Sequence, residues 1–354
     1  MEQERIANNI IDNILNMDPP AHTRTRKAAQ QAITRKLVLA AHARIERTAI
    51  ELIERFKSLG HCDLMQDFGY QLTLSVIAGM LNLPPTSLAD IRTWINDVFT
   101  LMTPINTRRN DEGTVHLPVP SDQLAACFKR INQAHGFFMA LIADRRAHPL
   151  IDDMTSLLVQ ATDDDGAPAF SSEKIVAHMV GLTAAGTDTT ANLIGSAVRH
   201  LSNDPATRKK VLEDPLLWDS VIEETLRRAS VARLLLRVTT KDTEIAGVQI
   251  AAGSCVALNV TGANSDPSKF EDPLRFDIFR PTNTDHIAFG AGRHFCLGSP
   301  LARPEAKIAL QVLYRELTDL SVDNSRPIAF SPLLTVGAMQ TLPVQWTPSN
   351  GPAH

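Results

Sequence analysis

The feature that most constrains the fold of this chain is residues 288–305, a stretch in which one cysteine lies among glycines. Cys296 follows Gly290 and Gly292 and precedes Gly298, and the residues beyond Gly298 favour a helix. Glycine allows the backbone to turn tightly and to approach a flat group closely. A helix N-terminus directs N–H groups at an anion in front of it. We therefore expect a tight loop that presents the Cys296 sulfur at the start of a helix.

A cysteine held in this way is a candidate metal ligand. Its thiolate is stabilised by a metal and by nearby N–H groups. As a soft anion it binds iron, and in haem enzymes it favours cleavage of the O–O bond. His294 lies two residues earlier, within reach of an anionic edge of a cofactor. Two alternatives stay open: a buried free cysteine, and a His-x-Cys zinc site, which is weaker because no second Cys/His pair has ligand spacing.

The stretch resembles the proximal haem loop of the cytochrome P-450 family, Phe-Gly-x-Gly-x-His/Arg-x-Cys-x-Gly. The matching residues are Phe289, Gly290, Gly292, His294, Cys296 and Gly298. The resemblance implies that Cys296 binds the iron of haem b. It also implies that the haem is contacted by Phe289, Gly290, His294 and Gly298.

The composition is that of a large globular protein and argues against several other classes. The chain has 354 residues, of which 44% are hydrophobic, and a formal net charge of -4, which argues against a dedicated nucleic-acid binder. The sequence has no apolar run of about 18 residues, so we expect no membrane span. The acidic N-terminus is unlike a signal peptide. Four widely spaced cysteines favour a reducing compartment, and we expect the cytoplasm; they are Cys62, Cys127, Cys255 and Cys296.

Residues 172–203 are predicted to form a long helix whose middle reads Ala-Ala-Gly-Thr-Asp-Thr-Thr, residues 184–190. Glycine and threonine are poor helix formers, so the run marks a bulge or a close approach. Its acid and hydroxyl can relay protons; the alternative is a packed helix with threonines bonded back to the backbone. The run resembles the family's oxygen-binding motif, Ala-Gly-x-Asp-Thr-Thr. That implies that Asp188 supplies protons, that Thr189 stabilises the activated oxygen, and that haem or substrate is faced by Leu182, Ala185 and Gly186.

A second helix begins after Asp18-Pro19-Pro20 and carries His22 and Arg26 on one face. By spacing alone, this pair reads as a solvated surface. The segment resembles the start of the family's C helix, in which the equivalent His and Arg bind haem propionates. By family position, Arg237 pairs with a propionate as well. The same resemblance implies a substrate pocket lined by Leu234, Leu235 and Val336.

The remaining chain is predicted to be mainly helical with a small antiparallel β region. Glu224 and Arg227 can pair, and the resemblance adds Arg280 as a third, structural member. A polar loop, 103–120, corresponds to the family's roof over the substrate. We expect helices at 2–16, 36–58, 64–82, 86–102, 121–147 and 216–229, and alternating, strand-like runs within 234–260 and 333–346. We divide the chain into a short N-terminal helix, 1–17, an oxygenase domain, 18–346, and a tail, 347–354.

The resemblance covers residues 18 to about 346 and implies a single-domain, soluble, bacterial-type haem-thiolate monooxygenase. Such an enzyme uses O2, a small hydrophobic organic substrate and electrons from a partner. A ferredoxin with its reductase, or an equivalent donor, is implied because the sequence carries no flavin or nicotinamide fingerprint. A basic patch for an acidic ferredoxin is one hypothesis, formed by Arg24, Arg293 and Arg303.

Two departures from the family pattern bear on this reading. The family has dozens of residues before Asp-Pro-Pro where this chain has 17, so we expect that N-terminal segment to be missing or replaced. Pro304 stands where the family usually has leucine, and we expect the helix after Cys296 to start late or to kink. The alternatives are a haem-loss relic that serves as a binding or scaffold protein, and a peroxide-driven enzyme.

Overall fold

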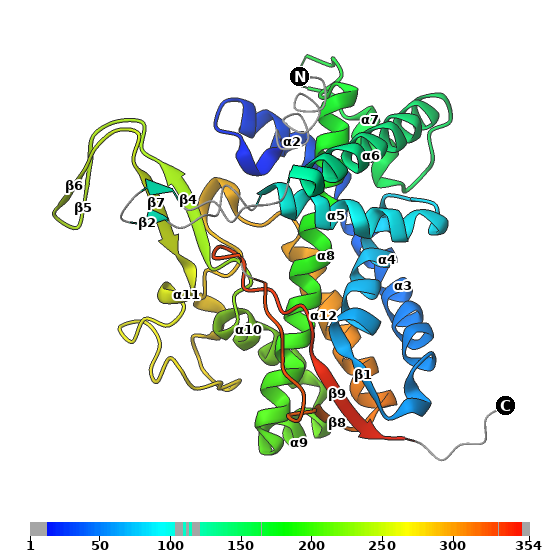
Figure 1. Cartoon of the computed structure of the whole chain (residues 1–354), viewed down its shortest axis with the longest axis vertical. Coiled ribbons are helices and arrows are strands. Elements are labelled where there is room, and N and C mark those ends of the chain that lie inside the picture. The colour runs from blue at the N-terminus through cyan, green and yellow to red at the C-terminus, as the bar shows by residue number, and fades with distance from the viewer. Residues whose placement is uncertain are drawn as a thin grey trace.

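The structure is a computed structural model that describes residues 13–102, 109–110, 113–114, 121–163, 165–331 and 333–348. Helices dominate this part of the chain, and the strands form one three-stranded sheet and three antiparallel pairs (Figure 1). The helices are α2 (Ala21–Ala32), α3 (Arg35–Glu54), α4 (Tyr70–Met80), α5 (Leu88–Met102), α6 (Ser121–Ala147), α7 (Met154–Gln160), α8 (Ser172–Asn203), α9 (Pro205–Glu213), α10 (Trp218–Arg228), α11 (Val260–Ala263) and α12 (Ser299–Glu316). The strands are β1 (His61–Asp63), β2 (Arg109–Asn110), β3 (Gly113–Thr114), β4 (Leu234–Val238), β5 (Thr243–Ile245), β6 (Val248–Ile250), β7 (Cys255–Asn259), β8 (Thr318–Val322) and β9 (Pro343–Thr347).

Helix α8 runs through the middle of the molecule and packs against α4, α6, α10 and α12 (Figure 1). It begins where the sequence predicts, because the Ser171 hydroxyl caps it by accepting a hydrogen bond from the Lys174 N–H. It ends at Asn203, before Asp204 and the proline that opens α9. Most of its length is buried, so the few exposed positions in its middle stand out.

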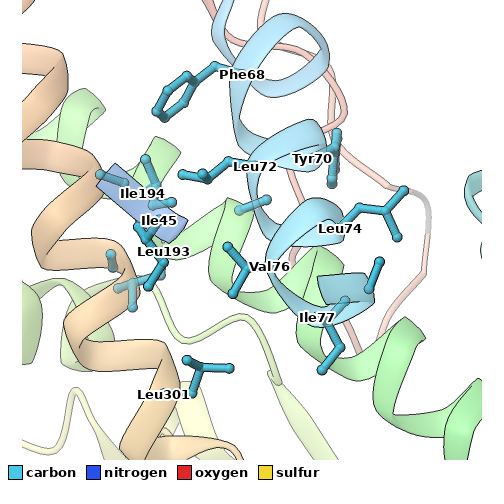
Figure 2. Close-up of a cluster of buried hydrophobic side chains, with 14 of the residues drawn as sticks. Ile45, Phe68, Tyr70, Leu72, Leu74, Val76, Ile77, Leu193, Ile194 and Leu301 are labelled. Carbon is cyan, nitrogen blue, oxygen red and sulfur yellow. The ribbon is translucent and has the colours of Figure 1, made fainter. Parts of the chain in front are cut away.

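The core holds α3, α4, α8 and α12 together (Figure 2). From one side of α4, Leu72 and Val76 point toward Leu193 and Ile194 of α8, and Ile45 of α3 lies beside them. Each large apolar side chain buried in this way contributes about 1.5–3 kcal/mol. Leu301 brings the first turn of α12 to the same core. This packing gives the cysteine loop and the middle of α8 a common rigid support.

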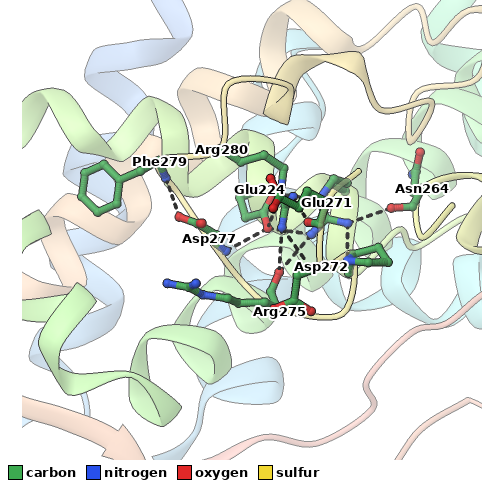
Figure 3. Close-up of polar contacts among 10 residues, drawn as sticks. Glu224, Asn264, Glu271, Asp272, Arg275, Asp277, Phe279 and Arg280 are labelled. Carbon is green, nitrogen blue, oxygen red and sulfur yellow. Dashed lines mark hydrogen bonds and ion pairs between the residues drawn. The ribbon is translucent and has the colours of Figure 1, made fainter. Parts of the chain in front are cut away.

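A buried ion network fastens α10 to the segment before the cysteine loop (Figure 3). Glu224 and Arg227 are fully buried, and Arg227 donates two hydrogen bonds to the Glu224 carboxylate, at 2.7 and 2.8 Å. Arg280 lies 3.7 Å from Glu224, as the third member that the resemblance implied. Arg227 also donates to the carbonyls of Asn264, Pro273 and Arg275. The network therefore holds a backbone segment that has no regular secondary structure of its own.

The β region predicted within 234–260 is confirmed. Strand β4 pairs antiparallel with β7, from Leu234 opposite Asn259 to Val238 opposite Cys255. Strands β5 and β6 form a hairpin that projects away from the helices (Figure 1), with Ala246 and Gly247 at positive φ in its turn. Near the C-terminal end, β9 lies between β1 and β8.

The structure departs from the sequence expectation in three described places. The helix expected over 64–82 begins as a π-helix, Leu64–Gly69, and is α-helical from Tyr70 to Met80; the Asp63 carboxylate caps its start by accepting from the N–H groups of Met65 and Gln66. The run 333–346 becomes a strand only at β9. Upstream of it, the Gly337 N–H bonds to the Val231 carbonyl and the Ser331 N–H to the Ala338 carbonyl.

The third departure concerns the start of α12, which is not late; the kink expected as the alternative stays a prediction. The N–H groups of Leu301 and Ala302 both bond to the Gly298 carbonyl, so the first turn exists before Pro304 is reached. Two further expectations cannot be compared fully. Of the helix expected at 2–16, residues 2–12 lie outside the described residues, and Ile14–Asn16 is a 3-10 turn. Most of the loop 103–120 lies outside them too, apart from the pair β2–β3.

Candidate functional site

The loop before α12 folds back on itself and fixes the cysteine. Gly290 and Gly292 have φ of +72° and +67°, a region in which a side chain would be strained. The Cys296 N–H donates to the Phe289 carbonyl at 2.9 Å, and the Phe295 N–H donates to the Gly292 carbonyl at 3.1 Å. The two glycines thus allow the tight loop that the sequence predicts.

The Cys296 sulfur belongs to a half-buried residue and has N–H donors in front of it. Burial raises the pKa of the thiol, while hydrogen bonds from the backbone N–H groups of Gly298 and Ser299 act to lower it, as do the charges of Arg26 and Arg303. A coordinated metal deprotonates such a thiol outright. The sulfur therefore lies where a thiolate ligand would be supported by the start of α12.

A second layer holds the loop in place. Phe289 carries the Arg303 guanidinium over its ring, at 4.6 Å, and Arg303 donates two hydrogen bonds to Glu223 of α10, at 2.6 and 3.0 Å. His286 contacts the same carboxylate at 3.1 Å. Burial acts to raise the pKa of Glu223, but the hydrogen bonds from His286 and Arg303 outweigh it and lower the pKa to about 2. Sequence reasoning did not find Glu223 or His286 because their partners are distant in the chain.

Positively charged and imidazole side chains gather beside the loop. The rings of His22 and His294 lie 4.2 Å apart, and the exposed fraction of His22 is 1%. Burial lowers the pKa of His22, as do the nearby His294, Arg26 and Arg293. Arg237 acts on His294 in the same direction. The structure thus brings together four residues that the sequence assigned to one role, namely His22, Arg26, Arg237 and His294.

The buried ring of His22 lacks a hydrogen-bond partner in this cluster of described residues, in which Asp18 is an acid that acts on both histidines. Neither ring nitrogen of His22 has a hydrogen-bond partner among the described residues, although both are buried. Buried polar atoms in folded proteins are nearly always bonded, so an unpartnered pair indicates a missing group. A haem has a flat apolar face and two carboxylates at one edge. Such a group fits this cluster, with His22 and Arg26 as the residues to hold the carboxylates.

The middle of α8 exposes a stripe on an otherwise buried helix. Ala185 and Thr189, one turn apart, are exposed, whereas Ala184, Thr187 and Thr190 are buried. Leu182 and Gly186 are half-buried beside them. The Thr189 hydroxyl donates to the Ala185 carbonyl at 2.6 Å, which is the back-bonding expected of a helical threonine. The stripe therefore combines space for a flat group with one hydroxyl.

Asp188 is held on the α5 side of α8. Arg92 of α5 donates to its carboxylate at 2.5 Å, and the exposed fractions of the Arg92 and Asp188 side chains are 25% and 13%. Burial raises the pKa of Asp188, and Arg92 opposes that rise. Sequence reasoning singled out Asp188 but not Arg92, because no local pattern links residues 96 apart.

The residues expected at the substrate pocket come from two segments. Leu235 shares a face of β4 with Arg237, and a Cβ added at Gly290 would lie 3.8 Å from its Cδ1. Leu234 points to the other face. Val336 forms a β-bridge with Ala232, two residues before β4 begins. Leu234, Leu235 and Val336 are all half-buried.

A helical body, a cysteine loop at a helix start and an unsatisfied cation cluster together define the class of haem-thiolate oxygenases. Comparison with known proteins agrees. The family profile described as Cytochrome P450 matches residues 3–216 and 215–343. The chain therefore belongs to the cytochrome P450 family. Members of this family are monooxygenases with a haem-iron cofactor, so the chain is a monooxygenase of this type.

Individual relatives support the same conclusion. The chain is 33% identical to the putative cytochrome P450 YjiB of Bacillus subtilis over 317 residues, 90% of this chain and 76% of that protein. Among solved structures, P450BioI in complex with an acyl carrier protein ligated to hexadec-9Z-enoic acid has a TM-score of 0.86 and 29% identity, over 98% of this chain and 84% of that one. CYP109E1 of Bacillus megaterium, in complex with testosterone, has a TM-score of 0.83 and 29% identity, over 95% and 86%. No helix within the described residues has the length and apolarity needed to span a bilayer.

Proposed function

We propose that the chain holds haem b through Cys296 and uses O2 and partner electrons to oxidise a small hydrophobic organic substrate. The observation that carries the proposal is the Cys296 sulfur, which faces the N–H groups of Gly298 and Ser299 at the start of α12. When bound, the haem supplies the reductive activation of O2, and a thiolate ligand favours O–O cleavage.

The protein residues have separate tasks in this proposal. His22, Arg26, Arg237 and His294 bind the two carboxylates and so orient the cofactor in its plane. Asp188 takes up protons, which the raised pKa of its buried carboxyl supports. Thr189 delivers them from a hydroxyl on the exposed stripe of α8. Leu182, Leu234, Leu235 and Val336 exclude water and contact the substrate.

The substrate class is proposed from the apolar candidates and from the relatives. All four pocket candidates are hydrophobic, and the two structural neighbours named above hold a fatty acyl chain and a steroid. We infer that this chain takes a molecule of similar apolarity. Free hexadecenoic acid and testosterone are suitable probes for the low- to high-spin shift of the ferric protein. A shift with polar probes only would contradict the inference.

The electron donor is proposed to be a ferredoxin that approaches exposed arginines beside the cysteine loop. Arg24 and Arg293 are exposed, whereas Arg303 is engaged with Glu223 and is left out of the patch. Reversing Arg24 and Arg293 to glutamate should slow reduction by an acidic ferredoxin at low salt and flatten the salt dependence. The matched reversal of Lys209, exposed on α9, should change neither. Equal effects of both reversals would remove the patch.

The central experiment replaces two cysteines in turn. Reduced, CO-bound protein should show the strongly red-shifted Soret band of a thiolate ligand, and Cys296→Ser should abolish it. Cys255→Ser is the matched control, because Cys255 is exposed on β7 and should leave the band unchanged. Failure of the wild-type chain to take up haem would favour the alternative of a haem-loss relic that serves as a binding or scaffold protein. Turnover with peroxide but not with a reductase system would favour the peroxide-driven enzyme.

The compartment is proposed to be the cytoplasm. All four cysteines are free thiols, including the exposed Cys255, which supports a reducing environment.

A further inference from the structure

Tyr70 occupies a junction that neither the sequence motifs nor the proposed function uses. It is the first residue of α4, with an exposed fraction of 5%. Its side chain leaves α4 on the side opposite to Leu72 and Val76, the side that also carries Leu74 (Figure 2). There Tyr70 contacts Arg92 of α5 and Met339 of the C-terminal segment.

The face of the Tyr70 ring holds Arg92. The guanidinium carbon of Arg92 lies 4.0 Å from the ring centroid, which is a close cation–π contact. From there, Arg92 reaches the Asp188 carboxylate at 2.5 Å. The Tyr70 ring thereby restricts the flexible Arg92 side chain to the conformation that pairs with Asp188.

The hydroxyl of Tyr70 holds the C-terminal segment. It donates to the Met339 carbonyl at 2.6 Å. The Met339 N–H donates in turn to the Asn192 side chain at 2.5 Å, and the Asn192 amide donates to the Asp188 carbonyl at 2.8 Å. Both backbone groups of Met339 are therefore fastened, one by α4 and one by α8.

These contacts form a closed circuit through Tyr70, Arg92, Asp188, Asn192 and Met339. Met339 lies three residues after Val336, on backbone that is not part of a regular strand. A shift of the segment that contains Val336 and Met339 would therefore move Tyr70, and the tyrosine ring would move Arg92.

We propose that Tyr70 is a positioning residue that couples the placement of the Val336 segment to the pairing of Asp188 with Arg92. The inference rests on the proposed function for the role of Asp188 and adds a residue that acts on it without touching substrate or cofactor. Binding of substrate against Val336 would then be communicated to the proton-carrying acid through one side chain.

Two substitutions separate the two halves of the coupling. Tyr70→Phe keeps the ring that stacks on Arg92 and removes the hydroxyl, which bonds to the Met339 carbonyl and also interacts with Arg92 and Asn192. Tyr70→Leu removes both. Arg92 of α5 is the charged group that acts on Asp188, and Asp188 in turn acts on Tyr70 of α4. Tyr314→Phe is the matched control, because the Tyr314 hydroxyl is buried on α12 with no hydrogen-bond partner in the described chain.

The first measurement is hydrogen exchange of the Met339 amide in the full-length chain. Tyr70→Phe should speed this exchange about two- to tenfold, the value of one neutral hydrogen bond. Tyr314→Phe should leave it unchanged. Equally fast exchange in wild type and Tyr70→Phe would show that the Tyr70 hydroxyl does not hold the Met339 segment in place.

The second measurement follows the carboxyl stretch of Asp188 with pH by infrared difference spectroscopy, with Asp188→Asn to assign the band. Tyr70→Leu should move the protonation midpoint to higher pH, because Arg92 would then be held less firmly against the carboxylate. Tyr70→Phe should move it less, because the ring still holds Arg92. A merely structural tyrosine would lower the melting temperature in both variants without separating their midpoints, and that result would overturn the coupling.

Both measurements remain informative if one variant fails to fold or if the chain takes no haem. Should Tyr70→Leu not fold, Arg92→Gln in the Tyr70→Phe background tests the same link: the two changes should be non-additive in Met339 exchange, and additivity would overturn the coupling. Neither readout needs turnover, so absence of haem would refute the proposed function alone. If the chain binds haem but the variants change neither the Met339 exchange rate nor the Asp188 protonation midpoint, this inference alone is refuted.

Discussion

At the scale of single residues, the environments of the four cysteines differ in what they offer a sulfur. Cys62 and Cys127 are buried, and burial raises their thiol pKa, that of Cys127 to about 11. Burial raises the pKa of Cys296 as well, but backbone N–H groups and arginine charges oppose that rise. A soft metal therefore finds its best-prepared ligand at Cys296, although Cys255 is more accessible.

The first prediction concerns the imidazole that lacks a partner. His22→Phe should fill the same space without offering a donor to a haem carboxylate. A charge-assisted hydrogen bond is worth about 1.5–3 kcal/mol, so haem should leave the variant about ten- to a hundredfold faster. Transfer of haem to an excess of a haem-free globin measures that rate.

The matched control for this prediction is Arg24→Gln, an exposed position two residues away on the same helix. Its haem transfer rate should equal that of the wild type. Equal rates in wild type and His22→Phe would show that His22 does not hold the cofactor.

At the scale of elements, helix α12 carries two glutamates in opposite situations. Glu305 has an exposed fraction of 2%, its Oε1 has no partner among the described residues, and burial raises its pKa well above the usual value. Glu316, at the end of the helix, bonds to Lys57 at 2.8 Å, and that hydrogen bond lowers its pKa. Ionisation of Glu305 therefore destabilises the folded chain, whereas ionisation of Glu316 on the same helix stabilises it.

The second prediction follows from this contrast. Between the unfolded and folded pKa values of Glu305, the folded chain binds the extra proton, so stability falls as pH rises, by up to about 1.4 kcal/mol per pH unit. Glu305→Gln should remove that slope and be more stable than wild type at pH 8, with a smaller gain at pH 5. Urea unfolding at the two pH values measures it.

Glu316→Gln serves as the control of opposite sign. The stability that Glu316 contributes is present above its unfolded pKa and is lost as pH falls through its lowered folded pKa. This variant should therefore be less stable than wild type at pH 8. A Glu305→Gln gain that is equal at both pH values would contradict the assigned ionisation.

The elements also show what sequence patterns can and cannot predict. Regular apolar spacing and a serine cap were sufficient to predict α8, and alternating apolar residues were sufficient to predict the strands β4 to β7. The pairing of β1 with β9 was not predictable, because His61 and Gln345 meet only in the folded chain. For the same reason the motif identified Asp188 but neither Arg92 nor Tyr70. The alternation over 333–342 misled, since those backbone groups bond to other segments.

At the scale of the whole molecule, stability depends on a buried charge network as well as on the apolar core. The Glu224 carboxylate accepts from Arg227 and from the Asp277 N–H, at 2.9 Å for the latter. Together with Arg280, it joins α10 to a long irregular segment that leads to the cysteine loop (Figure 3). The helices and that segment are thereby expected to unfold together.

The third prediction tests this coupling. Glu224→Gln leaves Arg227 as a buried charge without its counter-ion, which typically costs about 3–5 kcal/mol. The urea midpoint should fall accordingly in a single transition. Asp219→Asn is the control, because it breaks the partly exposed pair with Lys307 and should cost at most about 1 kcal/mol. Similar losses in both variants would refute the special role of the buried network.

The β5–β6 hairpin has a practical consequence. Its turn points outward, and a Cβ added at Gly247 would meet no described atom within 4 Å. Exposed loop tips of this kind tolerate inserted sequence. A short peptide tag or a fluorophore placed between Ala246 and Gly247 should therefore leave the body of the protein intact, which offers a defined point for tethering the chain to an electrode or a bead.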